Sequence, residues 1–303
     1  MMNQYDVIII GGGIAGLQAA IQLGRYKHSI AVIDSNDGRS SICRSYHNIL
    51  GWPDGVSGET LRSLGKMQAE RYGVSFVHNE VLKAEKGDEA FQLFCRDGET
   101  YTAKRLLFAT GVKDNIPPIK NMNKCLGLSV YVCPDCDGYE VVDKHVIVIG
   151  SGKPGANMAL TLTYFTKEIT FINHDWQNLD NETMDDLKKK EITYIQDDVE
   201  EILVAGESSH FVGVRLKSKD ILNGDRGFLG FGGNMVRSEL AKDLGIERTE
   251  NKHIIVDPRT KKTNVDHVWA AGDITVHSEQ TTIAMGDGMQ AAIWIHKSLI
   301  NEK

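Results

Sequence analysis

A glycine-rich motif that follows a short apolar segment occurs twice in this chain. The two sets of glycines lie 139 residues apart and are Gly11, Gly13 and Gly16, then Gly150, Gly152 and Gly155. Each copy has the order strand, GxGxxG, helix, which is typical of a dinucleotide-binding unit. The glycines allow a tight turn and let amides at a helix N-terminus approach a pyrophosphate. The repeat predicts an α/β fold with two Rossmann-like dinucleotide-binding domains.

The strand that follows each glycine motif differs at its end. Residues 30–33 lead into Asp34, whose carboxylate is placed to bind the hydroxyls of an adenosine ribose. The equivalent residues of the second copy, 169–172, lead into Asn173. The acid of the dinucleotide fingerprint is therefore present in the first copy and replaced in the second.

Two cysteines with two residues between them, Cys133 and Cys136, precede the second motif, and Asp137 follows them directly. Such a pair can close a small disulfide, and an acid beside it can exchange a proton with a thiolate. The alternative is half of a zinc site, which normally needs a second Cys or His pair at similar spacing. The nearest spare ligands, Cys125 and His145, are irregularly spaced. We therefore favour a redox-active pair and expect no metal.

The composition argues against several classes of protein. A net charge of −7 disfavours nucleic-acid binding, which needs a basic face. No apolar run approaches the roughly 20 residues of a membrane span. The first residues contain no basic segment of a secretion signal, and five cysteines do not form the framework of a secreted protein. These observations predict a cytoplasmic enzyme with no nucleic-acid or membrane partner.

Two stretches rich in proline or glycine, residues 112–118 and 229–234, mark where the chain changes domain. We expect residues 1–113 and 233–303 to form one discontinuous dinucleotide-binding domain. Residues 114–232 would form a second, inserted domain of the same kind that carries the cysteine pair and can move as a body.

Shorter patterns predict individual elements of these domains. Residues 91–95 and 101–103 are typical of a hairpin, because Asp97-Gly98 is a turn sequence. We expect a separate buried strand at 106–108, a short strand at 254–256 and a long core helix at 279–299.

Together these features resemble the low-molecular-weight thioredoxin reductase family, the class II FAD-dependent pyridine nucleotide-disulfide oxidoreductases. The resemblance covers essentially the whole chain and is most specific at residues 133–138 (CPDCDG), 109–111 (ATG) and 271–273 (AGD). It implies FAD in the first domain, a nicotinamide dinucleotide in the second, and a homodimer. It also implies a thioredoxin-like protein or a small disulfide as the partner.

The resemblance assigns roles to single residues. It implies that Cys136 is the thiol nearest the flavin, that Cys133 attacks the partner disulfide, and that Asp137 is the acid–base group. It places the pyrophosphate and ribose of FAD at Gly11, Gly12, Gly13, Gly16 and Asp34. It implies an adenine contact at Val81 and positions near the flavin end at Asn48, Gly111, Gly272, Asp273, Gln280 and Thr281. In the second domain it places a dinucleotide at Gly150, Gly152 and Gly155.

One departure from the family concerns the electron donor. Members that use NADPH carry His-Arg-Arg where this chain has residues 173–175, Asn-His-Asp, and arginines there can grip a 2′-phosphate. Lys153 is the only base in the second glycine loop. We expect poor use of NADPH and somewhat better use of NADH, with Asp175 or Asn173 bonding a free 2′-hydroxyl. A reduced ferredoxin or a dithiol substrate is an alternative donor.

Three functions fit the sequence. The favoured one is a dithiol–disulfide reductase that passes electrons through flavin and the Cys133–Cys136 disulfide. The second is a thiol oxidase like the gliotoxin-type enzymes, which passes electrons to oxygen and forms hydrogen peroxide. The third is a non-catalytic redox sensor.

Overall fold

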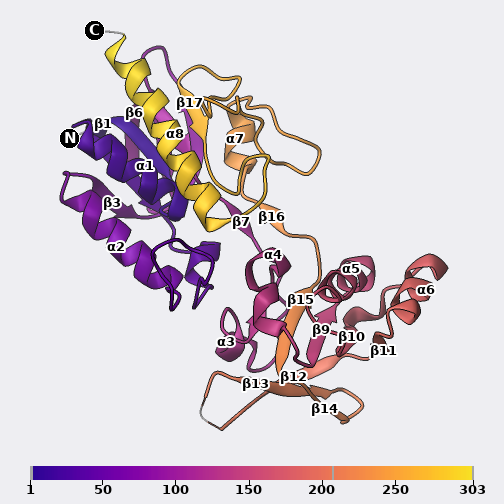
Figure 1. Cartoon of the computed structure of the whole chain (residues 1–303). Coiled ribbons are helices and arrows are strands. Elements are labelled where there is room, and N and C mark those ends of the chain that lie inside the picture. Colours follow the sequence, from indigo (N-terminus) through magenta and orange to yellow (C-terminus); the bar gives the residue numbers. More distant parts are fainter. Residues whose placement is uncertain (1–2, 207, 302–303) are drawn as a thin grey trace. The chain divides into compact units, whose positions relative to one another are not determined.

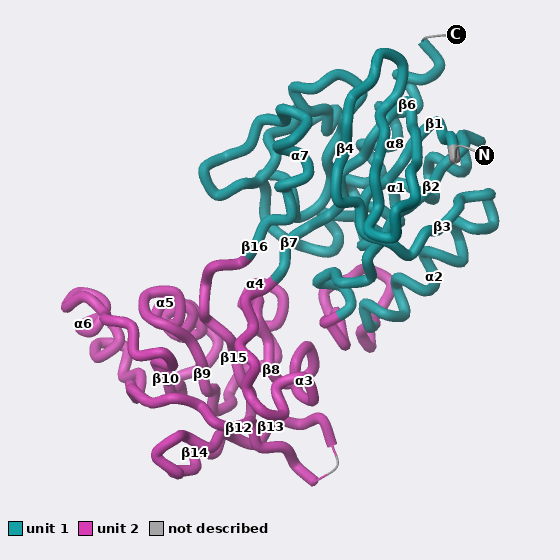
Figure 2. Tube along the Cα trace, turned by 180° about the vertical axis from the view of Figure 1, so that it is seen from behind, with its two compact units in different colours: residues 1–41, 57–113, 235–303 teal, residues 42–56, 114–234 magenta. Residues whose placement is uncertain are grey.

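The computed structural model describes residues 3–206 and 208–301. The chain divides into two compact units (Figure 2). Unit 1 contains residues 1–41, 57–113 and 235–303, and unit 2 contains residues 42–56 and 114–234. No helix in the described part of the chain is long and apolar enough to cross a membrane.

Unit 1 is built on a seven-stranded sheet in the order β3-β2-β1-β6-β5-β4, with β17 also paired to β6 (Figure 1). The central strands are parallel and buried on both faces, as their continuous runs of Val, Ile and Leu require. The strands are β1 (Asn3–Ile10), β2 (Ile30–Asp34), β3 (Ser75–His78), β4 (Val81–Lys86), β5 (Phe91–Cys95), β6 (Thr100–Phe108) and β17 (Val268–Ala270).

Helices cover both faces of this sheet. Alternate residues of β1 point to opposite sides, so that Val7 and Ile9 join one hydrophobic cluster while Ile8 and Ile10 join another. The first cluster includes α1 (Ile14–Arg25), α8 (Thr281–Ile300) and one residue of α2 (Gly58–Glu70). The second includes β4, β5 and α7 (Glu239–Asp243).

Two expected strands differ from the structure. The segments expected at 101–103 and 106–108 form one strand, β6, which pairs with β1 along nearly its whole length. Arg105, only 2% exposed, is accommodated because its guanidinium donates to Ser298 Oγ at 2.9 Å. Residues 254–256 form no strand, and Ile254 makes only isolated bridges.

Unit 2 repeats the α/β architecture, which confirms the expected pair of Rossmann-like folds. Its five-stranded parallel sheet has the order β11-β10-β9-β15-β8, and an antiparallel sheet has the order β12-β13-β14. The strands of the parallel sheet are β8 (Val130–Tyr131), β9 (Val146–Gly150), β10 (Ile169–Asn173), β11 (Thr193–Ile195) and β15 (Arg226–Gly230). The antiparallel strands are β12 (Val199–Val204), β13 (Phe211–Leu216) and β14 (Ile221–Asn223), and the helices include α3 (Met122–Cys125), α5 (Gly152–Leu162) and α6 (Asn181–Lys189).

The chain passes between the units at 41/42, 56/57, 113/114 and 234/235. The flanking strands β7 (Val112–Lys113) and β16 (Met235–Val236) pair antiparallel within unit 1. Residues 42–56 were expected in the first domain but cluster with unit 2. Arg44 fixes this segment, because its amide donates to Gly127 O at 3.0 Å and its guanidinium to Lys124 O at 2.7 Å.

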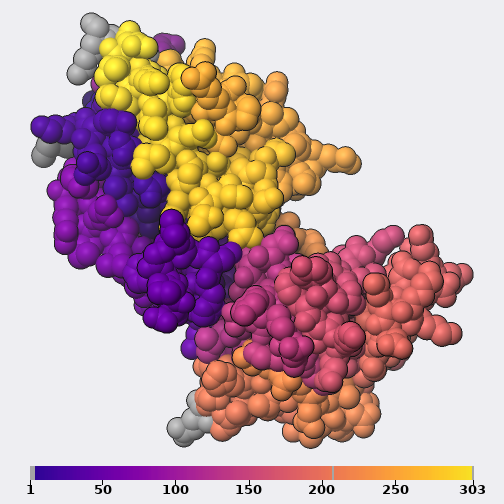
Figure 3. Space-filling model, in the orientation of Figure 1, coloured from indigo at the N-terminus to yellow at the C-terminus, as the bar shows by residue number. Residues whose placement is uncertain are grey.

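Helices α1 and α8 approach each other closely at Gly288. A Cβ added to Gly288 would lie 2.1 Å from the carbonyl oxygen of Ala15, which is fixed backbone. The other side of α8 forms part of the surface of unit 1 (Figure 3), where Ile283 and Ile300 are exposed. Only glycine at 288 permits this helix crossing.

We predict that Gly288→Ala lowers the free energy of unfolding by about 1–3 kcal/mol, because the added methyl group must push the two helices apart. Gly286→Ala is the matched control on the same helix, since a Cβ there meets nothing within 4 Å. It should be neutral or stabilise by roughly 0.5–1 kcal/mol, through the lower entropy of the unfolded chain. Urea unfolding of both variants measures the difference, and equal stabilities would contradict this packing.

Candidate functional site

Cys133 and Cys136 form a disulfide across α4 (Pro134–Asp137), with their Cα atoms 5.3 Å apart. The amide of Cys136 donates to Cys133 Sγ at 3.2 Å, a bond that favours a thiolate at Cys133 after reduction. Both side chains are partly exposed. The disulfide supports the redox interpretation of this pair.

The other three cysteines have the character of inert thiols. Burial raises the pKa of Cys43 to about 12 and that of Cys95 to about 11, and it also raises the pKa of Cys125. A thiol with so high a pKa is rarely present as the reactive thiolate at neutral pH. Cys125, the nearest spare zinc ligand in the sequence, is also fully buried.

Asp137 has an unusual proton affinity. Burial, and secondly the negative charge of Glu140, raise its pKa to about 7. A carboxyl group that is half protonated near neutral pH can both give and take a proton. The following turn is held in place because Gly138 packs on Phe165, whose ring would lie 2.4 Å from an added Cβ.

The first glycine motif brings β1, α1 and the end of β6 into close backbone contact. Gly11 has φ +106°, and a Cβ there would lie 2.4 Å from Ala109 O. A Cβ on Gly16 would lie 2.0 Å from Gly11 O. By contrast, Gly13, the N-cap of α1, has open space on its Cβ side. The backbone is therefore exposed in front of the α1 N-terminus, as a pyrophosphate would need.

Asp34 lies at the end of β2 beside this loop, and its side chain would contact a Cβ on Gly12 at 2.9 Å. Its Oδ2 accepts a hydrogen bond from Arg62 of α2 at 2.8 Å. Arg62 also donates to Asn36 Oδ1 at 2.7 Å, so the guanidinium orients the carboxylate that the sequence predicts to bind a ribose. Sequence reasoning did not identify Arg62.

The turn at Gly272 and Asp273 also reaches α1, since a Cβ on Gly272 would lie 2.8 Å from Ala15 Cβ. Asp287 of α8, almost fully buried, holds this turn by accepting from the amide of Gly272 at 3.1 Å. It also pairs with Lys261 Nζ at 2.8 Å and His277 Nε2 at 2.6 Å, and it accepts from Thr275 Oγ1 at 3.3 Å. A single acid within a long apolar helix was a signal for this network that sequence reasoning missed.

Arg39 connects the same turn to the segment before α8. Its guanidinium lies 3.1 Å from Asp273 Oδ2 and also pairs with Glu279. Burial raises the pKa of Asp273 although Arg39 opposes the shift. Gln280 is the N-cap residue of α8 and Thr281 its first residue, so both lie at the positive end of that helix.

A family model for pyridine nucleotide-disulphide oxidoreductases matches residues 5–288. The chain belongs to the pyridine nucleotide-disulphide oxidoreductase family. Its sequence is 30% identical, over 302 residues, to a thioredoxin reductase of Treponema pallidum (strain Nichols), and the alignment covers 96% of each chain. The expected resemblance to the low-molecular-weight thioredoxin reductase class is confirmed, and the protein is a flavin-dependent disulfide oxidoreductase.

Solved structures agree with this assignment. Thioredoxin reductase from Streptococcus pyogenes MGAS5005 superposes with a TM-score of 0.86 at 25% identity, covering 99% of this chain and 100% of that one. The structure of HlmI gives a TM-score of 0.86 at 26% identity, covering 98% and 93%.

Membership of the pyridine nucleotide-disulphide oxidoreductase family implies a flavin and a nicotinamide nucleotide. The glycine loop, Asp34 and the turn at Asp273 in unit 1 fit the flavin cofactor, because they combine an open helix N-terminus with a ribose ligand. In unit 2, Gly150 ends β9, Gly152 begins α5, and Gly155 packs against Phe171.

Three further predicted site residues are placed by the segments to which they belong. Val81 begins β4, and Gly111 lies between β6 and β7 with φ +63°. Asn48 lies in the segment 42–56 of unit 2. Their contacts with a cofactor stay predictions.

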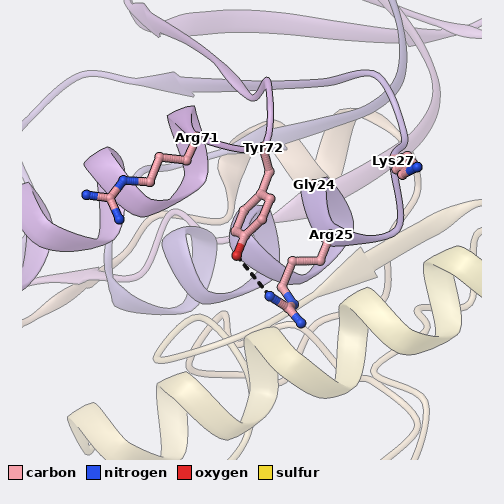
Figure 4. Close-up of a pocket in the computed structure, with 5 residues that line it drawn as sticks. All are labelled: Gly24, Arg25, Lys27, Arg71 and Tyr72. Atoms are coloured by element: carbon pink, nitrogen blue, oxygen red, sulfur yellow. Dashed lines mark hydrogen bonds between the residues drawn. The ribbon is translucent and has the colours of Figure 1, made fainter.

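A surface hollow of about 450 Å³ in unit 1 contains none of the predicted residues (Figure 4). Arg25 donates to Tyr72 Oη at 2.8 Å across it. Its lining is basic and carries no acid or thiol: Gly24, Arg25, Lys27, Arg71 and Tyr72. The residues that line this hollow are therefore not part of the redox site formed by the cysteine pair.

We predict that Asp137→Asn slows thiol–disulfide turnover roughly 10²-fold or more, because the proton carrier is lost. Glu140→Gln removes a like charge beside Asp137, so the pKa near 7 should fall and the pH–rate midpoint should move to lower pH. Asp135→Asn, an exposed neighbour, is the control. Stopped-flow rates between about pH 5 and 9 measure both effects, and a fully active Asp137→Asn enzyme would remove this residue from the mechanism.

We also predict a pH-dependent contribution of His277 to stability. Its hydrogen bond to Asp287 is the main cause that raises its pKa above 6.5. The protonated ring therefore stabilises the fold fully below pH 6.5, and this stabilisation is lost as the pH rises through the raised pKa. The Tm difference between wild type and His277→Gln should be largest near roughly pH 6 and shrink toward about pH 9. A difference that stays constant with pH would contradict this linkage.

Proposed function

We propose that this protein is an FAD-dependent dithiol–disulfide oxidoreductase of the thioredoxin reductase type. The observation that supports this proposal most strongly is the Cys133–Cys136 disulfide, which is followed directly by Asp137, a carboxyl group with a pKa of about 7. A thiol pair needs such a proton carrier, because reduction of a disulfide takes up two electrons and two protons.

The residues of unit 1 support FAD as the flavin. The α1 N-terminus and its glycine loop would hold the pyrophosphate, Asp34 a ribose, and Asp273 with the α8 N-terminus the flavin end. Asp287 would act by positioning the Gly272–Asp273 turn. The bound flavin would supply reversible two-electron exchange with the cysteine pair.

Thiol–disulfide exchange then follows from the chemistry of the pair. The Cys133 thiolate attacks one sulfur of the partner disulfide, which forms a mixed disulfide and releases the partner's first thiolate. Cys136 next attacks Cys133 Sγ, which restores the Cys133–Cys136 disulfide and releases the second partner thiolate. Asp137 removes the proton from Cys136 and passes it to the second leaving thiolate, and the first partner thiolate takes up from solvent the proton that Cys133 released when it ionised.

The partner that we propose is a thioredoxin-like protein or a small disulfide, and the active form is a homodimer in the cytoplasm. The names of the relatives support a thioredoxin-type partner. A reduced ferredoxin is a further proposed donor. Oxidation of a dithiol by dioxygen, which takes up the two electrons and two protons and becomes hydrogen peroxide, is an outcome that the same assay detects.

We predict that the purified protein is yellow and releases FAD on acid treatment. Release of FMN, or of no flavin, would refute the cofactor. In Cys133→Ser the remaining Cys136 thiolate should give a long-wavelength charge-transfer band with oxidised flavin, because Cys136 is the proposed flavin-side thiol. Cys136→Ser is the matched control and should lack the band, and the opposite pattern would reverse the two roles.

The reaction itself is tested with a thioredoxin and with dithiols of low molecular weight. Reduction of the thioredoxin disulfide by the reduced enzyme supports the proposal. Peroxide formed in proportion to the dithiol consumed would show that the reaction runs as an oxidase. Flavin-loaded protein that is inert in both assays would contradict an enzymatic role.

A further inference from the structure

The second glycine loop does not fit the nicotinamide nucleotide that the family implies. We infer that unit 2 has lost dinucleotide binding, because the turn of residues 173–177 closes over its glycine loop and uses the groups that a pyrophosphate needs. The inference deepens the proposed function, since it concerns the electron donor of that reaction. It rests only on contacts within unit 2.

The central residue of the closure is Asn173, which is fully buried. Its Oδ1 accepts from the amide of Gly152 at 2.9 Å, the amide that begins α5. Its Nδ2 donates to Gln177 O at 2.7 Å and to Tyr194 Oη at 3.0 Å, so both amide hydrogens are used. Because Asn173 is fully buried and both of its amide hydrogens are bonded within unit 2, this arrangement does not favour the bond to a ribose hydroxyl that the sequence suggested.

The start of α5 offers few donors to an anion. Gly152 has its amide bonded to Asn173, and Pro154 has no N–H, which leaves Lys153 among the first three positions of the helix. In unit 1 the residue equivalent to Pro154 is Ala15, which keeps its amide. Because phosphate binding at a helix N-terminus depends on these amides, α5 is a much weaker anion site than α1.

The space in front of the loop is also filled. A Cβ on Gly152 would lie 3.1 Å from Cβ of Gln177 and 3.3 Å from its Oε1, whereas the equivalent Gly13 has open space. Ser151, which replaces Gly12 of the first copy, is only 5% exposed. The Ser151 hydroxyl has no hydrogen-bond partner among the described residues. A single buried water molecule would satisfy this hydroxyl.

The turn is held in a strained shape rather than left free. Asp175 and Trp176 have φ of 64° and 57°, in the left-handed region that residues other than glycine rarely adopt. Asn173, the first residue of the turn, bonds Gln177 at the other end and Gly152 of the glycine loop, and these bonds hold this shape. A nucleotide would have to break them before it could enter.

The charges beside the turn also oppose a phosphate. His174, Asp175 and Asp198 have their ligand-type atoms within 4.8 Å of one another. His174 Nδ1 accepts from the amide of Val199 at 2.9 Å, which places the ring proton of neutral His174 on Nε2, 3.5 Å from Asp175. With neither nitrogen free to ligate, the cluster does not fit a metal ion, and its two carboxylates give the turn negative charge.

Calorimetric titration of the flavin-loaded protein with NADH, NADPH and ADP tests this inference. The filled flavin site of unit 1 prevents binding there. We expect no saturable heat for wild type up to roughly 1 mM nucleotide. The triple variant Ser151→Gly, Pro154→Ala, Gln177→Gly restores an amide and opens the loop, so it should bind at least one nucleotide tenfold more tightly than wild type.

Asn178→Ala, at an exposed position next to the turn, is the control and should bind no better than wild type. A wild-type Kd below roughly 0.1 mM for NADH or NADPH would overturn the inference. A folded, flavin-loaded triple variant that gains no affinity would show that these residues do not close the site.

A separate titration distinguishes two outcomes: an error in this inference and an error in the proposed function. Anaerobic dithiothreitol should reduce the flavin through Cys133 and Cys136 whether or not unit 2 binds a nucleotide. Bleaching by dithiothreitol together with tight NADPH binding would overturn only the inference. Flavin that dithiothreitol does not reduce would contradict the proposed function.

Discussion

Unit 1 depends on the absence of side chains around the first turn of α1. A Cβ on Gly16 would meet the Gly11 carbonyl at 2.0 Å, one on Gly288 the Ala15 carbonyl at 2.1 Å, and one on Gly272 the Ala15 side chain at 2.8 Å. Three segments distant in sequence therefore converge on one helix N-terminus. Their approach leaves the backbone at Gly13 open, and it places the Gly272 turn beside that opening, where a flavin nucleotide would be held.

The sequence predicted this scaffold well, because the signals for it are local. Apolar runs and glycine spacing act within one βαβ unit, the 139-residue repeat shows that there are two such units, and both Rossmann-like folds formed as expected. The cysteine pair was likewise identified from adjacent residues, and the structure joins it in a disulfide. The differences are two strand assignments, at residues 101–108 and 254–256, and contacts made over long range. Residues 42–56 cluster with unit 2, where Arg44 bonds Gly127 and Lys124, and the partners of Asp287, Lys261 and His277, become evident only in the folded chain.

The two copies of the dinucleotide motif show how few changes separate an open loop from a closed one. At equivalent positions Gly12 is replaced by Ser151, Ala15 by Pro154 and Asp34 by Asn173. Asp34 is an acceptor only, and it pairs with Arg62 at the surface of its loop. The amide of Asn173 is both donor and acceptor, so it can bond Gly152 and Gln177 at once and draw the turn over the loop. Charge alone, the basis of the sequence-based expectation about NADPH, could not reveal this closure.

A closed second loop changes what unit 2 contributes to the proposed reaction. The unit still presents the Cys133–Cys136 disulfide, with Gly138 anchored on Phe165 and Asp137 tuned to a pKa of about 7. Its parallel sheet then serves as a rigid support for thiol exchange instead of a donor site. If no nicotinamide binds there, the cysteine pair exchanges electrons with dithiols or disulfides, and the second redox partner must reach the flavin of unit 1 directly. The direction of electron flow then depends on two reduction potentials, that of the dithiol or disulfide at the cysteine pair and that of the partner at the flavin. A protein that binds no nicotinamide has no hydride donor that would fix this direction.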